Sequence, residues 1–422
     1  MARVAFLSPE VAGHLFPSCG LALELQKRGH QTTLYALKNA QPHAEKLGVP
    51  FQEVLPRDGF TFCRDTRTEK LNRTLGPKFQ INLREKFIKR VDLHLNTTLT
   101  DLKSAKPDAL IYDQNILAGS TIAEILNIPC ASVSAGMHWT RELDIPPQFT
   151  KWSYTGKRRH RLRNLAAYGV WDSYMREALQ NLNHHRRRHA LCPFKQVEST
   201  LSPMAHIAQS CKAFDFPYAR LPDHFHYGGS LAAYRAPGNL AFPWNRLDDR
   251  PVVFASMGTV RSSRRLSLYQ IIAEACAPLN AQLVMTTGAW DQEGITSQDL
   301  ARLPGEPVIV DYAPQIELLA KSDAFISHVG FNSACEGMMQ GVPIAALPQT
   351  GDQPAIASRL AHCGAGINLG QKNVNAEKLS QAIDRLLTEA RFKNAAGRIK
   401  EAMLATGGAP QAAAFLEARL GL

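Results

Sequence analysis

Residues 328–353 read HVGFNSACEGMMQGVPIAALPQTGDQ. A short apolar run, Ala324 to Ser327, precedes this stretch and is typical of a buried strand. Gly330 breaks the apolar pattern, and a second apolar run, Val342 to Leu347, predicts another strand. The residues between the two runs favour a helix. The stretch therefore predicts a strand, a glycine turn, a helix and a second strand in close succession.

The helix is expected from about Ala334 to Gln340. Asn332 and Ser333 are residue types that helices prefer at the N-cap, and Gly341 is the type that commonly ends them. A strand–turn–helix unit of this kind places unpaired N–H groups and the positive end of the helix dipole at the carboxyl edge of a parallel sheet. Phosphate groups bind at such an edge.

The polar residues of this stretch suit a sugar nucleotide. Three of them can donate hydrogen bonds to phosphate oxygens without bringing a negative charge: His328, Asn332 and Ser333. Glu336, one turn into the helix, can accept from two sugar hydroxyls, and Asp352-Gln353 offers two more polar groups at the same edge. The pattern predicts sites for a diphosphate, a ribose and a second sugar. A generic α/β unit with polar loops has the same spacing, so spacing alone leaves that alternative open.

The segment from Tyr312 to Gln353, YAPQIELL…FISHVGFNSACEGMMQGVPIAALPQTGDQ, resembles the donor-binding signature of family-1 glycosyltransferases, the UDP-glycosyltransferase superfamily. The elements APQ, H-x-G-x-N-S, E-G, G-V-P and D-Q follow in the family's order and spacing. The resemblance implies an α/β chain with a GT-B fold, in which two facing Rossmann-like domains form an active site in the cleft between them. The continuation, QPAIASRLAHCGAGI, resembles bacterial carotenoid and macrolide glycosyltransferases.

Length and composition fit a two-domain cytoplasmic protein. A chain of 422 residues is long for one domain and ordinary for two. Its 45% hydrophobic and 20% charged residues are typical of a folded α/β chain. No apolar stretch approaches the ~20 residues that span a bilayer, and the opening MARVAFLSPE is too short in its apolar part for a signal peptide. The eight cysteines have no zinc-type spacing and are expected to be reduced.

Strand-like and helix-like segments alternate in both halves of the chain, which predicts mostly parallel sheets. Between the halves, a segment rich in Gly, Pro and Ala lacks periodicity and is typical of a linker. We expect an acceptor-binding domain at 1–228, the linker at 229–250, a donor-binding domain at 251–408 and a final helix at 409–422 that crosses back to the first domain.

Two polar residues of the first half are expected at one sheet edge. A strand at Arg3–Ser8 and a helix at Pro17–Arg28 flank the loop PEVAGHLFP, which carries His14. The motif PDALIYD predicts a strand that ends at Asp113. Ligands bind at the carboxyl edge of such sheets. Taken alone, a packing histidine and a helix-capping carboxylate would be ordinary. The resemblance implies that His14 is the catalytic base and that Asp113 holds it by a hydrogen bond.

Glycosyl transfer needs such a base, because a hydroxyl with a pKa of about 15 is a poor nucleophile at neutral pH. An unperturbed histidine, with a pKa of about 6.5, is largely neutral at pH 7. Asp113 would hold the proton of one ring nitrogen of His14 and direct the other nitrogen to the acceptor. The acceptor hydroxyl would then take the place of serine in a catalytic triad.

The resemblance also implies the donor site. Thr259, in the element SMGT, is expected at a phosphate. Tyr312 stands where many plant members carry a tryptophan that stacks on uracil, so a preference for uridine or thymidine stays open. Gln315 would join Glu336 at the ribose. The expected donor-binding residues are Thr259, Tyr312, Ala313, Gln315, His328, Gly330, Asn332, Ser333, Glu336, Asp352 and Gln353.

The chain contains no D-x-D motif, so we expect transfer without a metal ion or other cofactor. Attack by the acceptor from the side opposite the leaving phosphate would invert the configuration at the sugar. Asp352 and Gln353 would bind hydroxyls of the transferred hexose, and a glutamine there is common with glucose donors. A lipophilic small molecule such as a carotenoid, polyketide, sterol or phenol is the expected acceptor. In the family the loop after Ser134 lines the acceptor pocket, which gives three candidate acceptor contacts: Met137, His138 and Trp139.

Residues 151–190 contain ten lysines or arginines and only two acidic residues. A solvated helical face is the commonest use of such a run, and docking to an anionic membrane surface at the inner face of the membrane also stays open. Nucleic-acid binding is not expected, because the chain has no recognised nucleic-acid motif.

Two other functions compete with transfer. A sugar-nucleotide epimerase shares the GT-B architecture, and a non-catalytic nucleotide-sugar binder or auxiliary subunit would need only the donor site. Neither needs an acceptor base with an orienting acid, so the presence of both His14 and Asp113 favours the transferase. A nicotinamide-dependent dehydrogenase is disfavoured, because no G-x-G-x-x-G follows the first strand.

Overall fold

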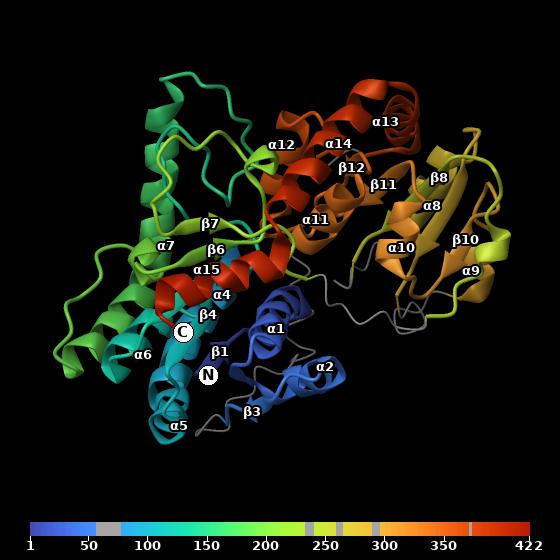
Figure 1. Cartoon of the computed structure of the whole chain (residues 1–422). Helices are drawn as coiled ribbons and strands as arrows, with labels where there is room; N and C mark the ends of the chain where they lie inside the picture. Colours follow the sequence, from blue (N-terminus) through green and yellow to red (C-terminus); the bar gives the residue numbers. More distant parts are fainter. Residues whose placement is uncertain (56–76, 233–239, 259–264, 289–295, 371–373) are drawn as a thin grey trace.

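The computed structural model describes residues 1–55, 77–232, 240–258, 265–288, 296–370 and 374–422. Two α/β units follow one another in these residues, each built on a parallel sheet (Figure 1). Every strand pair in the described parts of the chain is parallel, which confirms the prediction of mostly parallel sheets.

The first sheet has the strand order β3-β2-β1-β4-β5-β6-β7. Its strands are β1 Arg3–Leu7, β2 Gln31–Ala36, β3 Phe51–Glu53, β4 Ala109–Asp113, β5 Cys130–Ser134, β6 His206–Ala208 and β7 Phe225–Tyr227. The second sheet has the order β10-β9-β8-β11-β12-β13. Its strands are β8 Val252–Ser256, β9 Gln282–Thr286, β10 Val308–Val310, β11 Ala324–Ser327, β12 Ile344–Ala346 and β13 Gly366–Asn368.

Alternate residues of each central strand pack into different cores. In β1, Val4 and Phe6 join the core that contains residues of the first and last helices, α1 (Ala12–Lys27) and α15 (Gly408–Leu420). Ala5 and Leu7 join the core on the other face, which contains residues of the helices from α4 (Pro77–Leu93) to α7 (His160–Arg188). The second sheet is likewise buried on both faces. Burial on both faces explains why these strands are short, nearly continuous apolar runs in the sequence.

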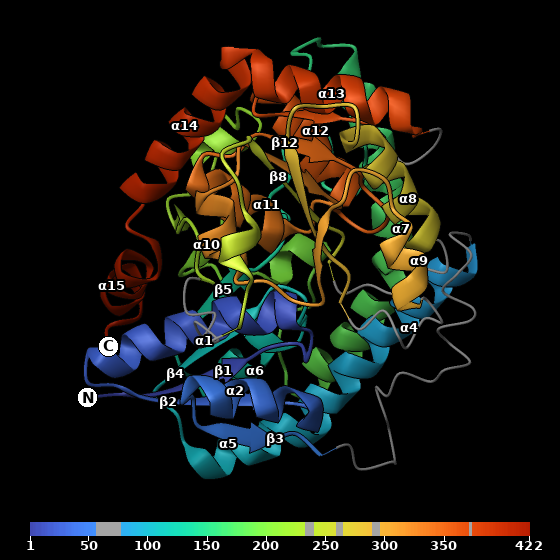
Figure 2. The same cartoon turned by 90° about the vertical axis from the view of Figure 1, so that its right-hand side faces the viewer.

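Helices of the first unit are α1 Ala12–Lys27, α2 Gln41–Leu47, α4 Pro77–Leu93, α5 Leu99–Ala105, α6 Gly119–Leu126 and α7 His160–Arg188. Those of the second are α8 Arg265–Cys276, α9 Ser297–Ala301, α10 Gln315–Ala320, α11 Phe331–Gln340, α12 Gln353–His362, α13 Ala376–Thr388 and α14 Ala390–Ala405. A final helix, α15 Gly408–Leu420, returns to the first unit and packs beside α1 (Figure 2). Glu417 of α15 binds Arg28 at 2.9 Å and His30 at 3.0 Å.

The described helices differ from the predicted ones at two places. The helix expected from Pro17 begins at Ala12, so that His14 lies in its first turn rather than in a loop. Helix α11 begins at Phe331 with Gly330 as its N-cap, not at Asn332-Ser333. A π-helical turn, His94–Thr98, lies between α4 and α5. The domain limits stay a prediction, and residues 233–239 of the expected linker lie outside the described residues.

Candidate active site

Both sheets reverse their strand order at one point, between β1 and β4 in the first and between β8 and β11 in the second. Ligands of open parallel sheets bind at the carboxyl side of such a point, because the loops on its two sides leave in opposite directions. Asp113 ends β4 and His14 follows β1, whereas Gly258 and His328 follow β8 and β11. The predicted catalytic base, its orienting acid and part of the predicted donor site therefore lie at these two points.

His14 and Asp113 are brought together from residues far apart in the chain. Nδ1 of His14 lies 2.7 Å from Oδ2 of Asp113, whose side chain is fully buried. The other carboxylate oxygen, Oδ1, accepts from the backbone N–H of Asn115 at 2.8 Å and from its side-chain amide at 3.0 Å. The carboxylate is thus held in place on one side while it binds the ring on the other. A carboxylate bond at Nδ1 leaves Nε2 for another partner.

The pKa of His14 is set by opposing influences. Burial lowers it, the charge and hydrogen bond of Asp113 raise it, Arg90 lowers it and Asp352 raises it, and the pKa stands above its ordinary value of 6.5. With this raised pKa, His14 becomes neutral at a higher pH than an ordinary histidine does. The positive ring that forms when it takes a proton is correspondingly stabilised by Asp113.

The turn before α11 holds His328 between two glycines. A Cβ atom added to Gly330 would lie 2.7 Å from Nε2 of His328, and one added to Gly258 would lie 2.5 Å from Cε1 of the same ring. Two residues next to the ring have positive φ: Gly258, in the loop after β8, at 69°, and Val329, between His328 and Gly330, at 55°. Such a compact turn needs glycine at the two positions that face the ring. It fixes His328 at the N-terminal end of α11.

Asn332 links the two sheets at this point. Its side-chain N–H donates to the carbonyl oxygen of Gly13 at 3.1 Å, and its Oδ1 accepts from Nε2 of Gln209 at 2.6 Å. Ser333 lies beside it in the first turn of α11 and is partly exposed. Because Gly13 precedes His14, the N-terminal turns of α1 and α11 lie against each other.

Two of the residues predicted at the ribose bind each other. The side-chain amide of Gln315, the first residue of α10, donates to Oε2 of Glu336 on α11. Tyr312, just before them, is 54% exposed and lines an open depression of about 890 Å³ between β10 and α9. Ala313 is partly buried against the core of the second unit. Thr259 lies outside the described residues.

Asp352 is the N-cap of α12 and Gln353 is its first residue, but the two side chains face different partners. The side chain of Gln353 accepts from the backbone N–H groups of Gln349 and Thr350, at 2.7 and 3.0 Å, and so closes its own turn. Asp352 interacts with the backbone of Met137 and with the charge of His14. Burial raises the pKa of Asp352, and these two partners oppose the rise. Asp352 thus reaches from the second unit to the predicted base.

The three predicted acceptor contacts are buried. Met137 packs into the core of the second unit, and Trp139 packs against Phe87 and Trp171. His138 is 2% exposed, and its Nε2 lies 2.7 Å from Asp215. A role in acceptor binding stays a prediction for all three residues.

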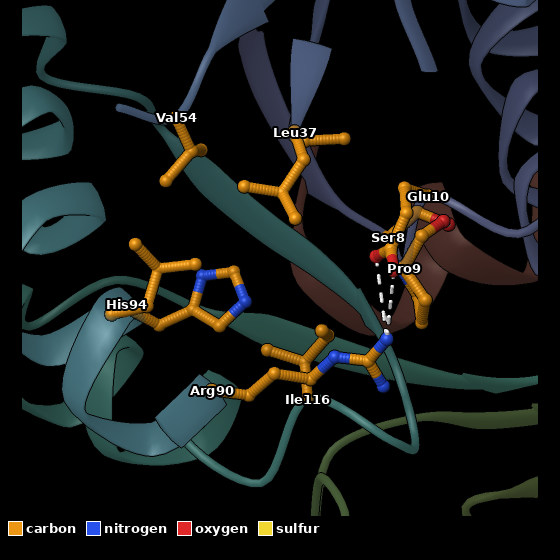
Figure 3. Close-up of a pocket in the computed structure, with 10 residues that line it drawn as sticks. Ser8, Pro9, Glu10, Leu37, Val54, Arg90, His94 and Ile116 are labelled. Atoms are coloured by element: carbon orange, nitrogen blue, oxygen red, sulfur yellow. Dashed lines mark hydrogen bonds and ion pairs between the residues drawn. The ribbon is translucent and has the colours of Figure 1, made fainter. Parts of the chain in front are cut away.

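A small cavity lies at the carboxyl ends of β1 and β2 (Figure 3). Its volume of about 10 Å³ is close to that of a single water site. Arg90 extends into it from α4 and binds Glu10 at 3.3 Å, so that a partly buried ion pair lies close to His14. Burial and the charge of Arg90 lower the pKa of His94, also in the wall, to about 3, which keeps that ring neutral.

Sequence reasoning missed Asn115, Arg90 and Gln209, which hold or face the predicted residues. Asn115 had a local signal, because Asp and Asn side chains often bind the backbone two residues away. Arg90 and Gln209 had none, since each meets its partner only through the tertiary fold. Among the described residues, no group of three or more His, Cys, Asp or Glu side chains could hold a metal ion. None of the described helices is both long enough and apolar enough to cross a membrane.

Residues 81–402 match the family described as UDP-glucoronosyl and UDP-glucosyl transferase. The zeaxanthin glucosyltransferase of Pantoea ananas is 28% identical over 418 residues, which cover 99% of this chain and 96% of that protein. The 4'-demethylrebeccamycin synthase of Lentzea aerocolonigenes is 24% identical over 411 residues, with 95% of each chain covered.

Solved structures share the fold over the whole chain. The calicheamicin glycosyltransferase CalG4 matches with a TM-score of 0.78 at 20% identity, covering 100% of this chain and 98% of that one. The glycosyltransferase VinC, solved in complex with dTDP, matches with a TM-score of 0.70 at 19% identity and 99% coverage of each chain. The expected GT-B fold is confirmed. With its family matched over most of its length, this chain belongs to the UDP-glucoronosyl and UDP-glucosyl transferases and is a glycosyltransferase.

Proposed function

We propose that this glycosyltransferase moves a hexose, glucose from UDP-glucose, onto a hydroxyl of a small lipophilic acceptor, with inversion at the sugar and without a metal ion. The observation that carries the proposal is the 2.7 Å contact of His14 with Asp113 at the turn where Asn332 binds Gly13. A base and its orienting acid thereby face the N-terminal end of α11, where a diphosphate would bind.

His14 is the proposed base. Its Nε2 takes the proton of the acceptor hydroxyl as that oxygen attacks the anomeric carbon, and Asp113 stabilises the positive ring that forms. The attack comes from the side opposite the leaving phosphate, so the configuration at the anomeric carbon inverts. The bond from sugar to phosphate breaks as the new bond forms, and the electron pair leaves with the nucleoside diphosphate.

The proposed diphosphate site stabilises the charge of that leaving group. His328, Asn332 and Ser333 supply donors at the N-terminal end of α11, whose dipole favours negative charge there. These groups take the part that a metal ion plays in transferases with a D-x-D motif, which this chain lacks. Gly330 keeps His328 in position, and Thr259 is proposed at a phosphate as well. No cofactor is proposed.

The rest of the donor has proposed partners nearby. Tyr312 and Ala313 would contact the base, and the bonded pair of Gln315 and Glu336 would hold the ribose. Asp352 and Gln353 are the proposed contacts of the hexose. For Gln353 this requires that its side chain exchange bonds with Gln349 and Thr350 for a sugar hydroxyl.

The proposed acceptor is a lipophilic small molecule such as a carotenoid, polyketide, sterol or phenol. One relative is named as a glucosyltransferase for zeaxanthin, a carotenoid, which supports a lipophilic small molecule as the acceptor. Met137, His138 and Trp139 remain the proposed acceptor contacts, although all three side chains are buried in this structure. The proposed acceptor-binding part of the chain is residues 1–228.

Release of UDP from UDP-glucose tests the proposal, measured in EDTA with and without a panel of lipophilic alcohols and phenols. We expect acceptor-dependent release that survives EDTA and falls about 10²–10⁴-fold in H14A. NMR of the product should show a β-glycoside. UDP binding without turnover by any acceptor would instead favour the non-catalytic binder, and acceptor-independent change of the donor sugar would favour the epimerase. Failure to bind UDP would direct the same assay to thymidine donors.

We further infer that the protein is cytoplasmic and that the first turns of α7 contact an anionic membrane surface. Leu162, Leu165 and Val170 are 75%, 52% and 70% exposed, and all three lie in the first three turns of that helix. Arg158 and Arg159, both exposed, lie immediately before it. Apolar side chains beside basic ones suit the boundary between acyl chains and anionic headgroups, where a lipophilic acceptor would dissolve.

Cosedimentation with lipid vesicles tests this contact. The parent chain should bind vesicles of phosphatidylcholine with phosphatidylglycerol, and the variant L162S/L165S/V170S should bind them about tenfold more weakly. L404S alters a leucine of similar exposure on α14 and serves as the control. Equal binding by the triple variant and the control would remove the inference.

A further inference from the structure

A buried cluster of charge joins the two units away from the predicted donor contacts. Oδ1 of Asp215, in the first unit, lies 2.7 Å from Nε of Arg359, on α12 of the second. Oδ2 of Asp215 lies 2.7 Å from Nε2 of His138 and accepts from the hydroxyl of Tyr227 at 3.2 Å. Asp215 is 5% exposed, Arg359 is 1% exposed and His138 is 2% exposed. Both oxygens of the Asp215 carboxylate therefore have hydrogen-bonding partners.

The carboxylate of Asp215 stays ionised in this setting. Burial alone would raise its pKa, but the charges of Arg359 and His138 and their hydrogen bonds bring it far below its ordinary range. The guanidinium of Arg359 also lies 4.2 Å from the centre of the Phe216 ring. A planar group with both a fixed carboxylate and a fixed ring face has little freedom to turn.

Arg359 follows Asp352 by seven residues, which is close to two turns of α12. The two side chains therefore project from the same face of the helix, and both meet the first unit. Arg359 meets Asp215, and Asp352 meets the backbone of Met137, next to His138 in the chain. A Cβ on Gly136 would lie 3.2 Å from Oδ2 of Asp352, so the approach at that end is close.

The loop 136–138, which contacts α12, is held in place by hydrogen bonds of Gln114. The side-chain amide of Gln114 donates to the carbonyl oxygen of Met137 at 2.8 Å, and its Oε1 accepts from Ser134 at 2.6 Å. Gln114 directly follows Asp113, which holds His14. Asp113, which holds His14, and Gln114, which holds the loop at Met137, are thus consecutive residues, so the base and the loop that contacts α12 are supported by the same short segment.

Resting on the function proposed above, we propose that Asp215 and Arg359 are positioning residues, which seat α12 on the loop 136–138 so that Asp352 stands beside His14. The pair touches neither sugar nor acceptor. It fixes the distance between the carboxylate that binds the hexose and the base that receives the acceptor's proton. A displacement of about 1 Å in such a distance can reduce a rate about 10²-fold.

Three variants test the proposal: R359M, the neutral double variant D215N/R359M, and R385M as the control. Arg385 lies on α13, where it binds Glu389 at the surface and faces neither His14 nor α12. R359M leaves Asp215 buried without its cation and should lower Tm. D215N/R359M has no such charge and should recover most of Tm. We expect kcat for transfer to stay at least tenfold below the parent in the double variant, with UDP binding unchanged, and R385M to match the parent.

The fraction of donor lost to hydrolysis supplies a second measure, because a misplaced hexose meets water instead of the aligned acceptor. It should rise in the double variant and not in R385M. A folded double variant with parental kcat and parental hydrolysis would overturn the proposal, since the pair would then contribute only to folding.

Titration of the His14 ring by NMR makes the result independent of transfer. The charged groups described around His14 are Asp113, Arg90 and Asp352, and Asp352 acts to raise its pKa. If α12 shifts, that contribution is lost, and the pKa of His14 should fall in D215N/R359M but not in R385M. An unchanged pKa would overturn the positioning role. A parent that binds UDP but transfers to no acceptor would refute the proposed function, while this titration would still decide the role of the pair.

Discussion

The side-chain amide of Asn332 donates to the carbonyl oxygen of Gly13 at 3.1 Å, across the junction of the two units. In a regular helix the N–H of the residue four positions later would donate to that carbonyl, but here this residue is Pro17, which has no N–H. The proline therefore opens one acceptor in the first turn of α1, and the other unit supplies a donor. The same turn carries His14.

This relationship predicts a coupling between Asn332 and Pro17. N332A should lower the free energy of unfolding, because it leaves the Gly13 carbonyl without this donor. In the P17A background the restored N–H of residue 17 can satisfy the carbonyl, so the same change should cost about 1 kcal/mol less. Urea unfolding of the four proteins gives the coupling directly. N164A, which removes a buried amide bonded to the Leu143 carbonyl, should show no coupling to P17A.

The pH dependence of transfer should report His14. Its raised pKa means that the neutral ring forms above the ordinary value of 6.5, so kcat/KM should rise with pH through an inflection above 6.5. In D113N the carboxylate no longer offsets the effect of burial on the pKa of His14, so the inflection should move to lower pH. The plateau should also drop by about 10²–10⁴-fold, because the ring loses its orientation. If the inflection of kcat/KM stayed at the same pH in D113N, the assignment of His14 as the base would be contradicted.

Arg90 should act on the same inflection with the opposite sign. Its charge lowers the pKa of His14, so its removal should raise that pKa. R90M should therefore move the inflection of kcat/KM to higher pH. R90K keeps the charge and should leave the inflection near that of the parent. Movement to lower pH in R90M would show that Arg90 does not face the base as described.

Local patterns predicted the elements of this fold well. The strand expected at Ala324–Ser327 has those limits in the structure, and the strand expected at Arg3–Ser8 is β1, Arg3–Leu7. Both follow from apolar periodicity and from adjacent residues that end each element. The start of α1 was mispredicted because Pro17 suggested a first helical position. The helix tolerates the proline because its first turn forms before it, with Val11 accepting from the N–H of both His14 and Leu15.

Partners far apart in the chain could not be inferred from spacing. Asp215 and Arg359 lie 144 residues apart, and only the approach of the two units pairs them. The same pairing explains why His138, expected at the acceptor, is buried against Asp215. The contact of His14 with Asp113 was anticipated through the family resemblance, because composition alone does not indicate that β1 and β4 are neighbours.

The glycines around His328 allow a sharp test of the proposed diphosphate site. Gly330 has φ of −55°, so alanine fits its backbone, but the new Cβ would lie 2.7 Å from the ring and must displace it. G330A should therefore weaken UDP binding about tenfold, or about 1.4 kcal/mol, as measured by isothermal titration calorimetry. G397A is the matched control, because a Cβ in that position on α14 meets nothing within 4 Å. It should raise stability by about 0.5–1 kcal/mol and leave UDP binding unchanged. Full UDP affinity in a folded G330A would show that His328 does not bind the donor.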